Sequence, residues 1–390
     1  MNNTWKNFIS EGVAPETLKK IQDALASAGG ESYIVGGAVR DSLIPGVPES
    51  KDVDFVVRKL SYEQMVKILS PLGEANFVGD QFGVVTAIID GEEFDFALPR
   101  AKEVKTGDGH TDFEVETDPY ATLEVDAARR DFTINAMYRG RDGKVYDYYN
   151  GRSDLKNGII RAVGDPDARI KEDPLRMVRA VQFAVRFDFK IEDGMKQAIA
   201  ANLDLLTSVS GERIMMELEK AWTRGKDMNV LANLLAETGI GEKLFGADFA
   251  PMVIPNRDVV EQFIAYFLHG GNPKIMKLSR DMAKYLNAAK TAADSRFKAF
   301  EVPNGRVVLP KIINALAAHP RYAERASYLR AALNLPLNLE ELVITGHDLI
   351  EAGLRGAEIG KAVKMILSLI DNGELKNDRN DILGAIENVD

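Results

Sequence analysis

The sequence predicts an α+β protein in which a small α/β region is followed by a longer all-helical region. Before about residue 165, short apolar runs bounded by glycine and proline alternate with helical segments. Residues 172–390 show helical spacing of apolar side chains and no convincing strand pair. The chain has 390 residues, which is enough for two or more domains.

The first elements follow from apolar spacing. Residues 11–28 predict an amphipathic helix, because Leu18, Ile21 and Leu25 recur at intervals of three and four. Residues 33–35 then predict a buried strand.

A glycine pair, Gly36 and Gly37, follows that strand and allows the backbone to turn sharply into a helix. The N-terminus of a helix presents free N–H groups and partial positive charge, which favour phosphate oxygens. Arg40, one turn into this helix, is expected to add a bidentate phosphate contact. The pattern predicts a phosphate-binding turn.

Two carboxylates follow in the next predicted strand, residues 52–57. Side chains at positions i and i+2 of a strand share a face, so Asp52 and Asp54 are expected to project together. Mg²⁺ binds to one or two such carboxylates together with substrate phosphates. Most isolated Asp-x-Asp pairs are solvated strand ends, but the preceding diglycine turn favours a metal site here.

Residues 62–69 predict a helix, and residues 82–89 and 93–98 predict a hairpin around an Asp-Gly turn. Asp95, on the second hairpin strand, is a candidate third carboxylate beside the first two. A polar position on an amphipathic strand explains Asp95 equally well.

Residues 100–118 are polar, contain Gly107 and Gly109, and predict a mobile surface loop. The run that follows places Arg130 and Asp131 directly before apolar residues. An Arg-Arg-Asp run is commonly a solvated helix face, but its closeness to an apolar segment favours a site arginine. Residues 147–155 predict a turn-rich connection and residues 159–163 a last short strand.

Composition narrows the classes of function. The net charge is −10, and residues 1–150 contain 16 Lys and Arg but 26 Asp and Glu, so the later residues are neutral overall. This balance argues against binding nucleic acid by bulk electrostatics. The absence of cysteine excludes thiolate metal sites, and the four histidines lack metal-ligand spacing. With no apolar run of spanning length and no signal pattern near residue 1, we expect a cytoplasmic protein that does not enter membranes.

A second polar constellation opens the helical region. Pro174 suits the first position of a helix and Asp173 its N-cap. Asp173, Arg176 and Arg179 are spaced by three, so they are expected to share one face. A capped helix with a charged outer face is the plainer interpretation.

The functional interpretation rests on hydrogen-bond complementarity. A carboxylate only accepts hydrogen bonds and a guanidinium only donates them. Cytosine and adenine each present an amino donor beside an unprotonated ring nitrogen, whereas uracil and guanine present a carbonyl beside a ring N–H. A neighbouring Asp and Arg therefore match C and A, so such a pair can select two nucleotides without a template.

Taken in order, Gly-Gly-x-Val-Arg-Asp, Asp-x-Asp, Arg-Arg-Asp-x-x-x-Asn-Ala and Glu-Asp-x-x-Arg resemble the class II (bacterial-type) CCA-adding tRNA nucleotidyltransferases, within the polymerase-β-like superfamily. The resemblance spans about residues 30–225 and returns in a tail motif at 346–360. It implies that Asp52 and Asp54 bind catalytic Mg²⁺. It also implies nucleotide binding by residues of the other three motifs and of the helix that follows the last of them, namely Gly36, Gly37, Arg40, Arg130, Asp131, Asp173, Arg176 and Arg179.

The resemblance further implies a nucleotidyltransferase head, neck, body and tail, at residues 31–165, 166–225, 226–340 and 341–390 after an N-terminal helix within residues 1–30. Its partners would be the 3′ end of tRNA, CTP and ATP, with tRNA held by the tail. Gln182 stands where many relatives carry arginine, which leaves nucleotide preference less defined. Loop 100–118 favours addition of all three nucleotides. A poly(A) polymerase and a catalytically silent RNA- or nucleotide-binding module remain the alternatives.

Overall fold

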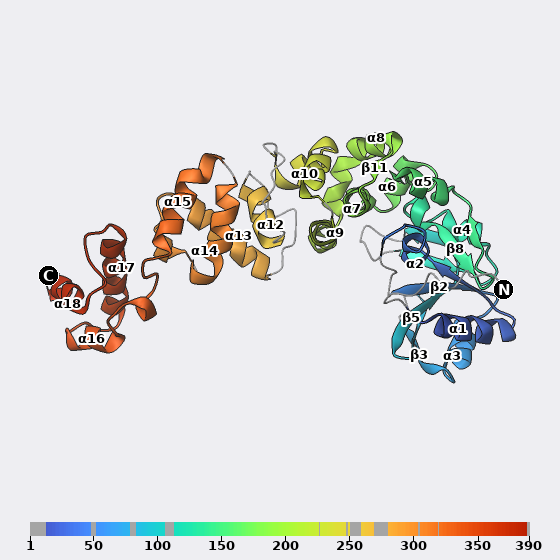
Figure 1. Ribbon diagram of the computed structural model, residues 1–390, viewed down its shortest axis with the longest axis horizontal. Coiled ribbons are helices and arrows are strands. Elements are labelled where there is room, and N and C mark those ends of the chain that lie inside the picture. Colours follow the sequence, from blue (N-terminus) through green and yellow to red (C-terminus); the bar gives the residue numbers. More distant parts are fainter. Residues whose placement is uncertain are drawn as a thin grey trace. The chain divides into compact units, whose positions relative to one another are not determined.

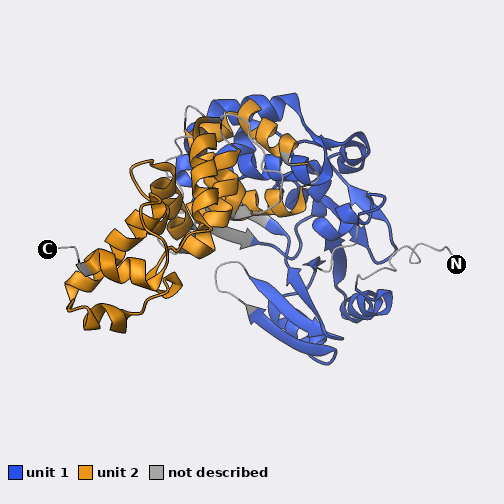
Figure 2. Cartoon of the chain, turned by 60° about the vertical axis from the view of Figure 1, so that its left-hand side comes forward, with its two compact units in different colours: residues 1–210 blue, residues 211–390 orange. Residues whose placement is uncertain are grey.

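The fold is described from a computed structural model. It describes residues 13–47, 52–78, 83–105, 113–225, 227–246, 249, 259–268, 280–302, 305–318 and 320–387. The chain divides into two compact units, residues 1–210 and 211–390 (Figure 2). The first unit contains the mixed sheet and the second is helical, which confirms the predicted α+β class.

A seven-stranded sheet in the order β3-β4-β5-β2-β1-β8-β9 organises the first unit. Strand β2 pairs in parallel with β5, and every other pair in this sheet is antiparallel. The strands are β1 (Glu31–Val35), β2 (Val53–Arg58), β3 (Gly73–Val78), β4 (Val84–Ile89), β5 (Glu92–Ala97), β8 (Met137–Gly140) and β9 (Val145–Asp147). A separate hairpin consists of β6 (Arg100–Lys105) and β7 (Phe113–Thr117).

Different helices pack on the two faces of this sheet. On one face, α1 (Pro15–Ser27) and α3 (Tyr62–Leu69) contact each other and the sheet (Figure 1). The phenylalanines of β2 and β5 are buried, and the rings of Phe55 and Phe96 stack 5.0 Å apart. On the other face, α4 (Leu123–Ala127) packs against Val35 and Val56. Asp54 lies on this second face, beside Val56 on the same strand.

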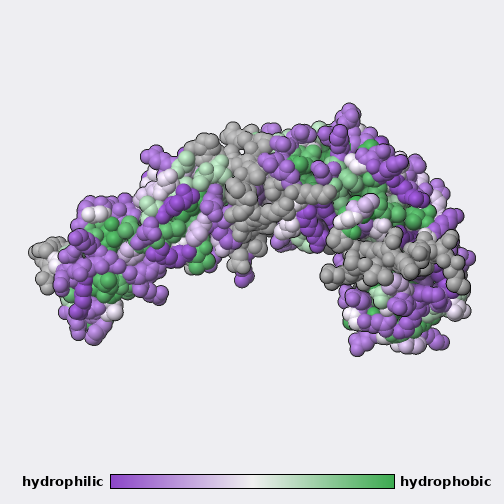
Figure 3. Space-filling model, viewed as in Figure 1, coloured by the Kyte–Doolittle hydropathy of each residue, from purple (hydrophilic) through white to green (hydrophobic). Residues whose placement is uncertain are grey.

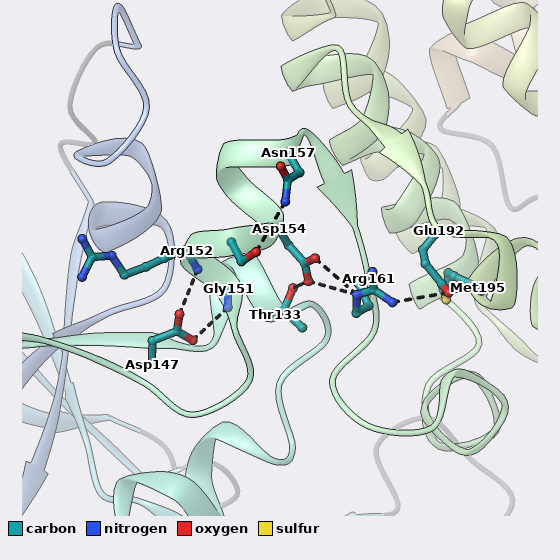
Figure 4. A network of polar contacts seen from close by, with 10 residues as sticks. Thr133, Asp147, Gly151, Arg152, Asp154, Asn157, Arg161, Glu192 and Met195 are labelled. Carbon is teal, nitrogen blue, oxygen red and sulfur yellow. Dashed lines mark hydrogen bonds and ion pairs between the residues drawn. The ribbon is translucent and has the colours of Figure 1, made fainter.

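Helix α5 (Gly151–Asn157) begins at a position that requires glycine. The carboxylate of Asp147 accepts hydrogen bonds from the backbone N–H groups of Gly151 (2.8 Å) and Arg152 (2.9 Å), as Figure 4 shows. A Cβ atom on Gly151 would lie 2.2 Å from the carbonyl oxygen of Thr133. Because that contact is with backbone, a larger residue would displace the first turn of α5.

The remaining elements of the first unit are one short strand pair and several helices. A short parallel pair joins β10 (Ile159–Ile160) to β11 (Lys190–Ile191). Arg161 forms ion pairs with Asp154 (3.1 Å) and Glu192 (3.4 Å) beside this pair (Figure 4). The other helices here are α2 (Gly37–Asp41), η2 (Thr133–Asn135), α6 (Pro166–Glu172), α7 (Arg176–Phe187), α8 (Asp193–Asn202) and η3 (Leu203–Ser208).

Among the described residues of the second unit, one apolar cluster forms around α12 to α15 and another around α16 to α18. Its helices are α9 (Gly211–Arg224), α10 (Met228–Glu237), α11 (Ile240–Phe245), α12 (Val259–Leu268), α13 (Arg280–Ala293), η4 (Ala299–Glu301), α14 (Gly305–Ala317), η5 (Pro320–Tyr322), α15 (Ala323–Ala332), η6 (Leu339–Glu341), α16 (Gly346–Glu351), α17 (Ala357–Asp371) and α18 (Arg379–Glu387). Figure 3 shows mainly hydrophilic residues on the visible face of α16 to α18. Within the described ranges, no helix has the length and apolar character to span a bilayer.

Several elements agree with the sequence predictions. Helix α3 has the predicted bounds, and β4 and β5 form the predicted hairpin. Asp90 and Gly91 both adopt positive φ angles, 55° and 85°, as a two-residue hairpin turn requires. The predicted boundaries of head, neck, body and tail remain predictions, since the division into two units falls at a single place, after residue 210.

Other predictions were wrong in ways that have physical causes. Residues 100–105 and 113–117 form the β6–β7 hairpin rather than a loop. Their strands are rich in Lys, Arg and Glu and pair only with each other among the described strands, so no apolar alternation marks them. Gly107 and Gly109 lie outside the described residues. Strands β3, β8, β9 and β11 were missed, and the last three have only two to four residues.

The start of α7 also differs from the prediction. The helix begins at Arg176, and its N-cap is Leu175 rather than Asp173. Asp173 instead ends α6 and accepts a hydrogen bond from the backbone N–H of Leu175 (3.2 Å). The Asp-Pro pair therefore forms a turn between two helices, because Pro174 disfavours helical backbone at the residue before it.

Candidate active site

A cavity of about 350 Å³ lies against the sheet where β2 and β5 are adjacent. Segments distant in the sequence supply four arginines and four aspartates to its lining, which are Arg100, Arg129, Arg130, Arg179, Asp54, Asp95, Asp126 and Asp131. A larger cavity of about 570 Å³, lined by Lys19, Tyr33 and Arg141 among others, lies at the opposite end of β1. We assign the chemistry to the smaller cavity because it combines the carboxylates with the arginines next to the diglycine turn.

Strand register places the carboxylates together. Asp54 on β2 is directly opposite Asp95 on β5, and Asp95 is directly opposite Thr86 on β4. Directly opposed residues point to the same face, so the three side chains form a row across the sheet. The Thr86 hydroxyl donates a hydrogen bond of 2.6 Å to Asp95 and thereby orients it. Asp52 is exposed and immediately precedes β2, so the strand begins one residue later than the predicted start at residue 52.

The electrostatics of this row suit a divalent cation. Although Asp54 is exposed by surface area, partial desolvation among its neighbours in the cavity raises its pKa; the negative charges of Asp95 and Asp52 raise it further, while Arg130 opposes the shift. Among the described residues no three acidic or histidine side chains form a ready metal centre. Mg²⁺ is commonly bound by one or two protein carboxylates, with phosphate and water as its other ligands.

The diglycine turn and Arg130 meet at this cavity. Gly36 adopts a φ of 68°, a conformation that side chains disfavour, between β1 and α2. The Nη1 atom of Arg130 lies 3.7 Å from the position that a Cβ on Gly36 would occupy. The turn and the arginine are therefore close enough to contact one anionic group.

Arg40, predicted to contact phosphate, is instead buried, with 3% of its surface exposed. It donates hydrogen bonds to Asp41 (2.7 Å) and Asn135 (2.5 Å), and its guanidinium lies 5.2 and 4.8 Å from the ring centres of Phe183 and Phe187. Burial lowers the pKa of Arg40, and the charge of Asp41 partly offsets this effect. Arg40 does not line the cavity, so its phosphate contact remains a prediction without support in this arrangement.

The polar contacts of Arg40 continue to α7. Asn135 donates to Asp131 (3.0 Å), and Asp131 accepts from Arg179 (2.6 Å). Burial alone would raise the pKa of Asp131, but the charge and hydrogen bonds of Arg179 hold it below its usual value. Asp131 and Arg179 both line the cavity, as their predicted role in nucleotide binding requires.

The predicted base-reading pair lies next to the cavity rather than in its lining. Arg176 is 8% exposed and donates to the carbonyl oxygens of Arg129 (3.1 Å) and Arg169 (2.8 Å) and to Glu172 (2.9 Å). These bonds use Nη1 and one hydrogen of Nη2, which leaves Nε of Arg176 without an acceptor among the described residues. Arg129 lines the cavity and connects it to Arg176.

Three features of the site were not apparent from the sequence. No pattern in the sequence around Thr86 or Arg100 indicates a place in the site. Asp126 could have been found, since it precedes Arg130 by four residues, which is the spacing of an ion pair on a helix. Gln182, noted for replacing an arginine, is 3% exposed within α7, where it packs inside the protein.

We expect protons and metal to compete for Asp54. Mn²⁺ affinity should fall as the pH drops through the pKa of Asp54, which lies above the ordinary value of 3.8. In Asp95→Asn one repelling charge is removed, so this fall should begin at a lower pH. Titration of Mn²⁺ binding against pH, with Glu92→Gln on the same strand as the control, measures both. Identical midpoints in the wild type and Asp95→Asn would contradict coupling of the two carboxylates.

Comparisons with known proteins agree with this geometry. Residues 32–161 match the family model of the poly A polymerase head domain, and residues 188–249 match that of a probable RNA and SrmB-binding site of polymerase A. The structure resembles that of the Bacillus stearothermophilus CCA-adding enzyme solved in complex with CTP. The TM-score is 0.67 and the identity 27%, with 96% of this chain and 97% of that one covered.

Full-length relatives decide the family. The chain is 32% identical to a CCA-adding enzyme of Pediococcus pentosaceus, with 96% of this chain and 97% of the relative covered. It is also 32% identical to a CCA-adding enzyme of Lactobacillus helveticus, with 95% and 96% covered. Since this identity extends through both units, the chain belongs to the family of CCA-adding enzymes.

Proposed function

We propose that this protein adds C, C and A to the 3′ end of tRNA from CTP and ATP, with Asp52 and Asp54 holding two Mg²⁺ ions. The terminal 3′ oxygen forms a bond to the α-phosphorus, the bond from that phosphorus to the bridging oxygen breaks, and pyrophosphate leaves. When bound, the metal ions supply activation of the attacking hydroxyl and stabilisation of the leaving group. The observation that carries the proposal is the row of Asp54 and Asp95 in a cavity that also contains Arg130.

The residues of the cavity take separate roles in this proposal. Arg130 and the diglycine turn hold the triphosphate, because the Nη1 atom of Arg130 lies beside Gly36. Asp131, fixed by Arg179, accepts hydrogen bonds from the ribose. Asp95 acts as a third carboxylate, oriented by Thr86. The tRNA is bound through the helical second unit, by shape and backbone contacts as RNA helices require. A cytoplasmic location remains part of the proposal.

The direct test supplies tRNA lacking its 3′ end and one labelled nucleotide at a time. Incorporation of C twice and then of A is expected, with little U or G. Long adenosine tracts without use of CTP would identify a poly(A) polymerase instead. Binding of nucleotide with no incorporation of any kind would identify a catalytically silent module.

Base selection is assigned to Asp173 and Arg176, with Arg179 beside them. Arg176→Lys keeps the charge that faces Glu172 but loses the planar Nε edge that can donate to C or A. We expect selectivity for C and A over U and G to fall roughly 5- to 150-fold, corresponding to ~1–3 kcal/mol. Competition between labelled nucleotides measures this ratio.

A matched control for that experiment lies on the same helix. Arg186→Lys changes an arginine that pairs with Asp41 (3.2 Å) rather than facing Arg129. It should leave the selectivity unchanged. Equal selectivity in Arg176→Lys and the wild type would refute the base-reading role.

A further inference from the structure

Asp126 on α4 is a buried carboxylate of the cavity, 5% exposed, to which the sequence motifs assign no role. One of its oxygens, Oδ2, accepts hydrogen bonds from the Tyr138 hydroxyl (2.6 Å) and from Nη2 (3.0 Å) and Nε (3.3 Å) of Arg130. The other, Oδ1, accepts from the backbone N–H of Arg100 (3.1 Å). A single side chain therefore contacts three separate segments.

The hydrogen bonds to Arg130 hold one edge of its guanidinium and leave its Nη1 nitrogen near Gly36. Asp126 accepts from the Nε and Nη2 edge, Nε also donates to the Tyr138 hydroxyl (3.1 Å), and the ring of Tyr138 lies 5.2 Å from the guanidinium carbon. Nη1 is left directed at Gly36. Since a guanidinium is planar, fixing one edge fixes the direction of the remaining nitrogen. Asp126 thus determines where the anion-binding part of Arg130 points.

The contact to Arg100 concerns a different element. Arg100 is the first residue of β6, and the β6–β7 hairpin closes at its base through a hydrogen bond from the backbone N–H of Asp118 to the carbonyl oxygen of Pro99 (3.0 Å). Helix α4 packs against β6 at this base. Asp126 is therefore hydrogen-bonded to the base of the β6–β7 hairpin, where the hairpin joins the rest of the first unit.

We propose that Asp126 is a positioning residue that sets the triphosphate-binding arginine and the base of the β6–β7 hairpin together. Polyphosphate binding at Arg130 and ordering of the hairpin base are therefore coupled through one carboxylate. This inference rests on the proposed function, in which Arg130 holds the triphosphate.

Charge and geometry make opposite predictions for Asp126→Asn. If the carboxylate only neutralised Arg130, removing its charge would strengthen binding of an anion. If it positions Arg130, the loss of the charged hydrogen bonds should weaken binding, by about 10-fold. The sign of the change therefore separates a positioning role from a purely electrostatic one.

The test measures binding of CTP and of tripolyphosphate to the full chain by calorimetry, and hydrogen exchange at residues 99–105 and 113–118. In Asp126→Asn we expect both ligands to bind about 10-fold more weakly and the hairpin base to exchange faster. Tyr138→Phe removes the hydroxyl bonded to Asp126 and to Nε of Arg130 but keeps the bonds between Asp126 and both Arg130 and Arg100, so it should weaken binding less than Asp126→Asn does. Tighter or unchanged binding in Asp126→Asn, or unchanged exchange at the hairpin base, overturns the inference.

Two further outcomes keep the test decisive. If Asp126→Asn does not fold, Asp126→Glu keeps the charge but moves the carboxylate by one methylene, and it should weaken CTP binding in the same way. Wild-type affinity in that variant would refute positioning. If the wild type itself binds neither ligand, the proposed function fails, whereas normal wild-type binding with an unaffected Asp126→Asn removes only this inference.

Discussion

Replacing Asp54 by asparagine is expected to lower the rate of nucleotide addition by roughly 10²- to 10⁴-fold, since a metal-binding carboxylate contributes several kcal/mol to stabilising the transition state. Asp54 faces Asp95 across β2 and β5 and lines the cavity. Single-turnover addition of C to tRNA measures the loss. Glu93→Gln removes the same charge from an exposed position on β5 and should retain nearly full activity.

The same substitution should affect stability in the opposite direction. Because partial desolvation and neighbouring carboxylates raise the pKa of Asp54, its ionised form destabilises the folded state above that pKa. Asp54→Asn removes this cost, so it should unfold at a higher temperature than the wild type near pH 7. The difference should disappear as the pH falls toward 3.8, where the wild-type side chain is neutral. A variant that is both inactive and less stable would show that Asp54 serves the fold instead.

Replacing Arg40 by methionine should destabilise the first unit by about 3–5 kcal/mol, because it leaves the buried Asp41 without its nearest charged partner. Asn135 would lose a donor at the same time. For a unit of this size the unfolding temperature should fall by roughly 6–20 °C. Hydrogen exchange of α2 and α7 in increasing urea measures the loss where Arg40 acts.

The control and the alternative outcome for Arg40 are both informative. Arg141→Met removes an arginine whose side chain is 56% exposed and pairs with Asp23, and it should shift stability by no more than about 0.5 kcal/mol. If Arg40 holds phosphate, as the sequence motif suggested, Arg40→Met would instead leave stability unchanged and raise the KM for CTP. The two roles are thus separated by which quantity changes.

Much of the fold was predictable because local patterns and tertiary contacts agree. Strands β1, β2 and β4 carry β-branched residues on buried positions, and α1 and α3 carry apolar residues at helical spacing. Such features depend on neighbours in the sequence. The alignment of Asp54 with Asp95 does not, because it comes from the pairing of β2 with β5.

The remainder depends on partners that are distant in the sequence. From the sequence alone, Arg40 is expected to be an accessible arginine on a helix. In the structure its guanidinium is covered by the rings of Phe183 and Phe187, which lie more than 140 residues later in the chain. Asp126, on helix α4, is hydrogen-bonded to Arg100 on β6 and to Tyr138 on β8, and its own sequence segment indicates neither contact. Strand β11 has two residues and exists because β10 is beside it. No periodicity within these segments carries that information.

The pairing of β10 with β11 restrains the position of α7, the helix that carries Arg176 and Arg179. It ties the chain before α6 to the chain after α7, so both helices form a closed loop whose ends are hydrogen-bonded to each other. Arg179 adds an ion pair from the middle of that loop to Asp131. The strand pair and this ion pair therefore restrain α7, which begins at Arg176, against the segment that carries Asp131. If Arg176 reads the incoming base as proposed, it does so from a helix whose position is restrained on both sides rather than from an untethered segment.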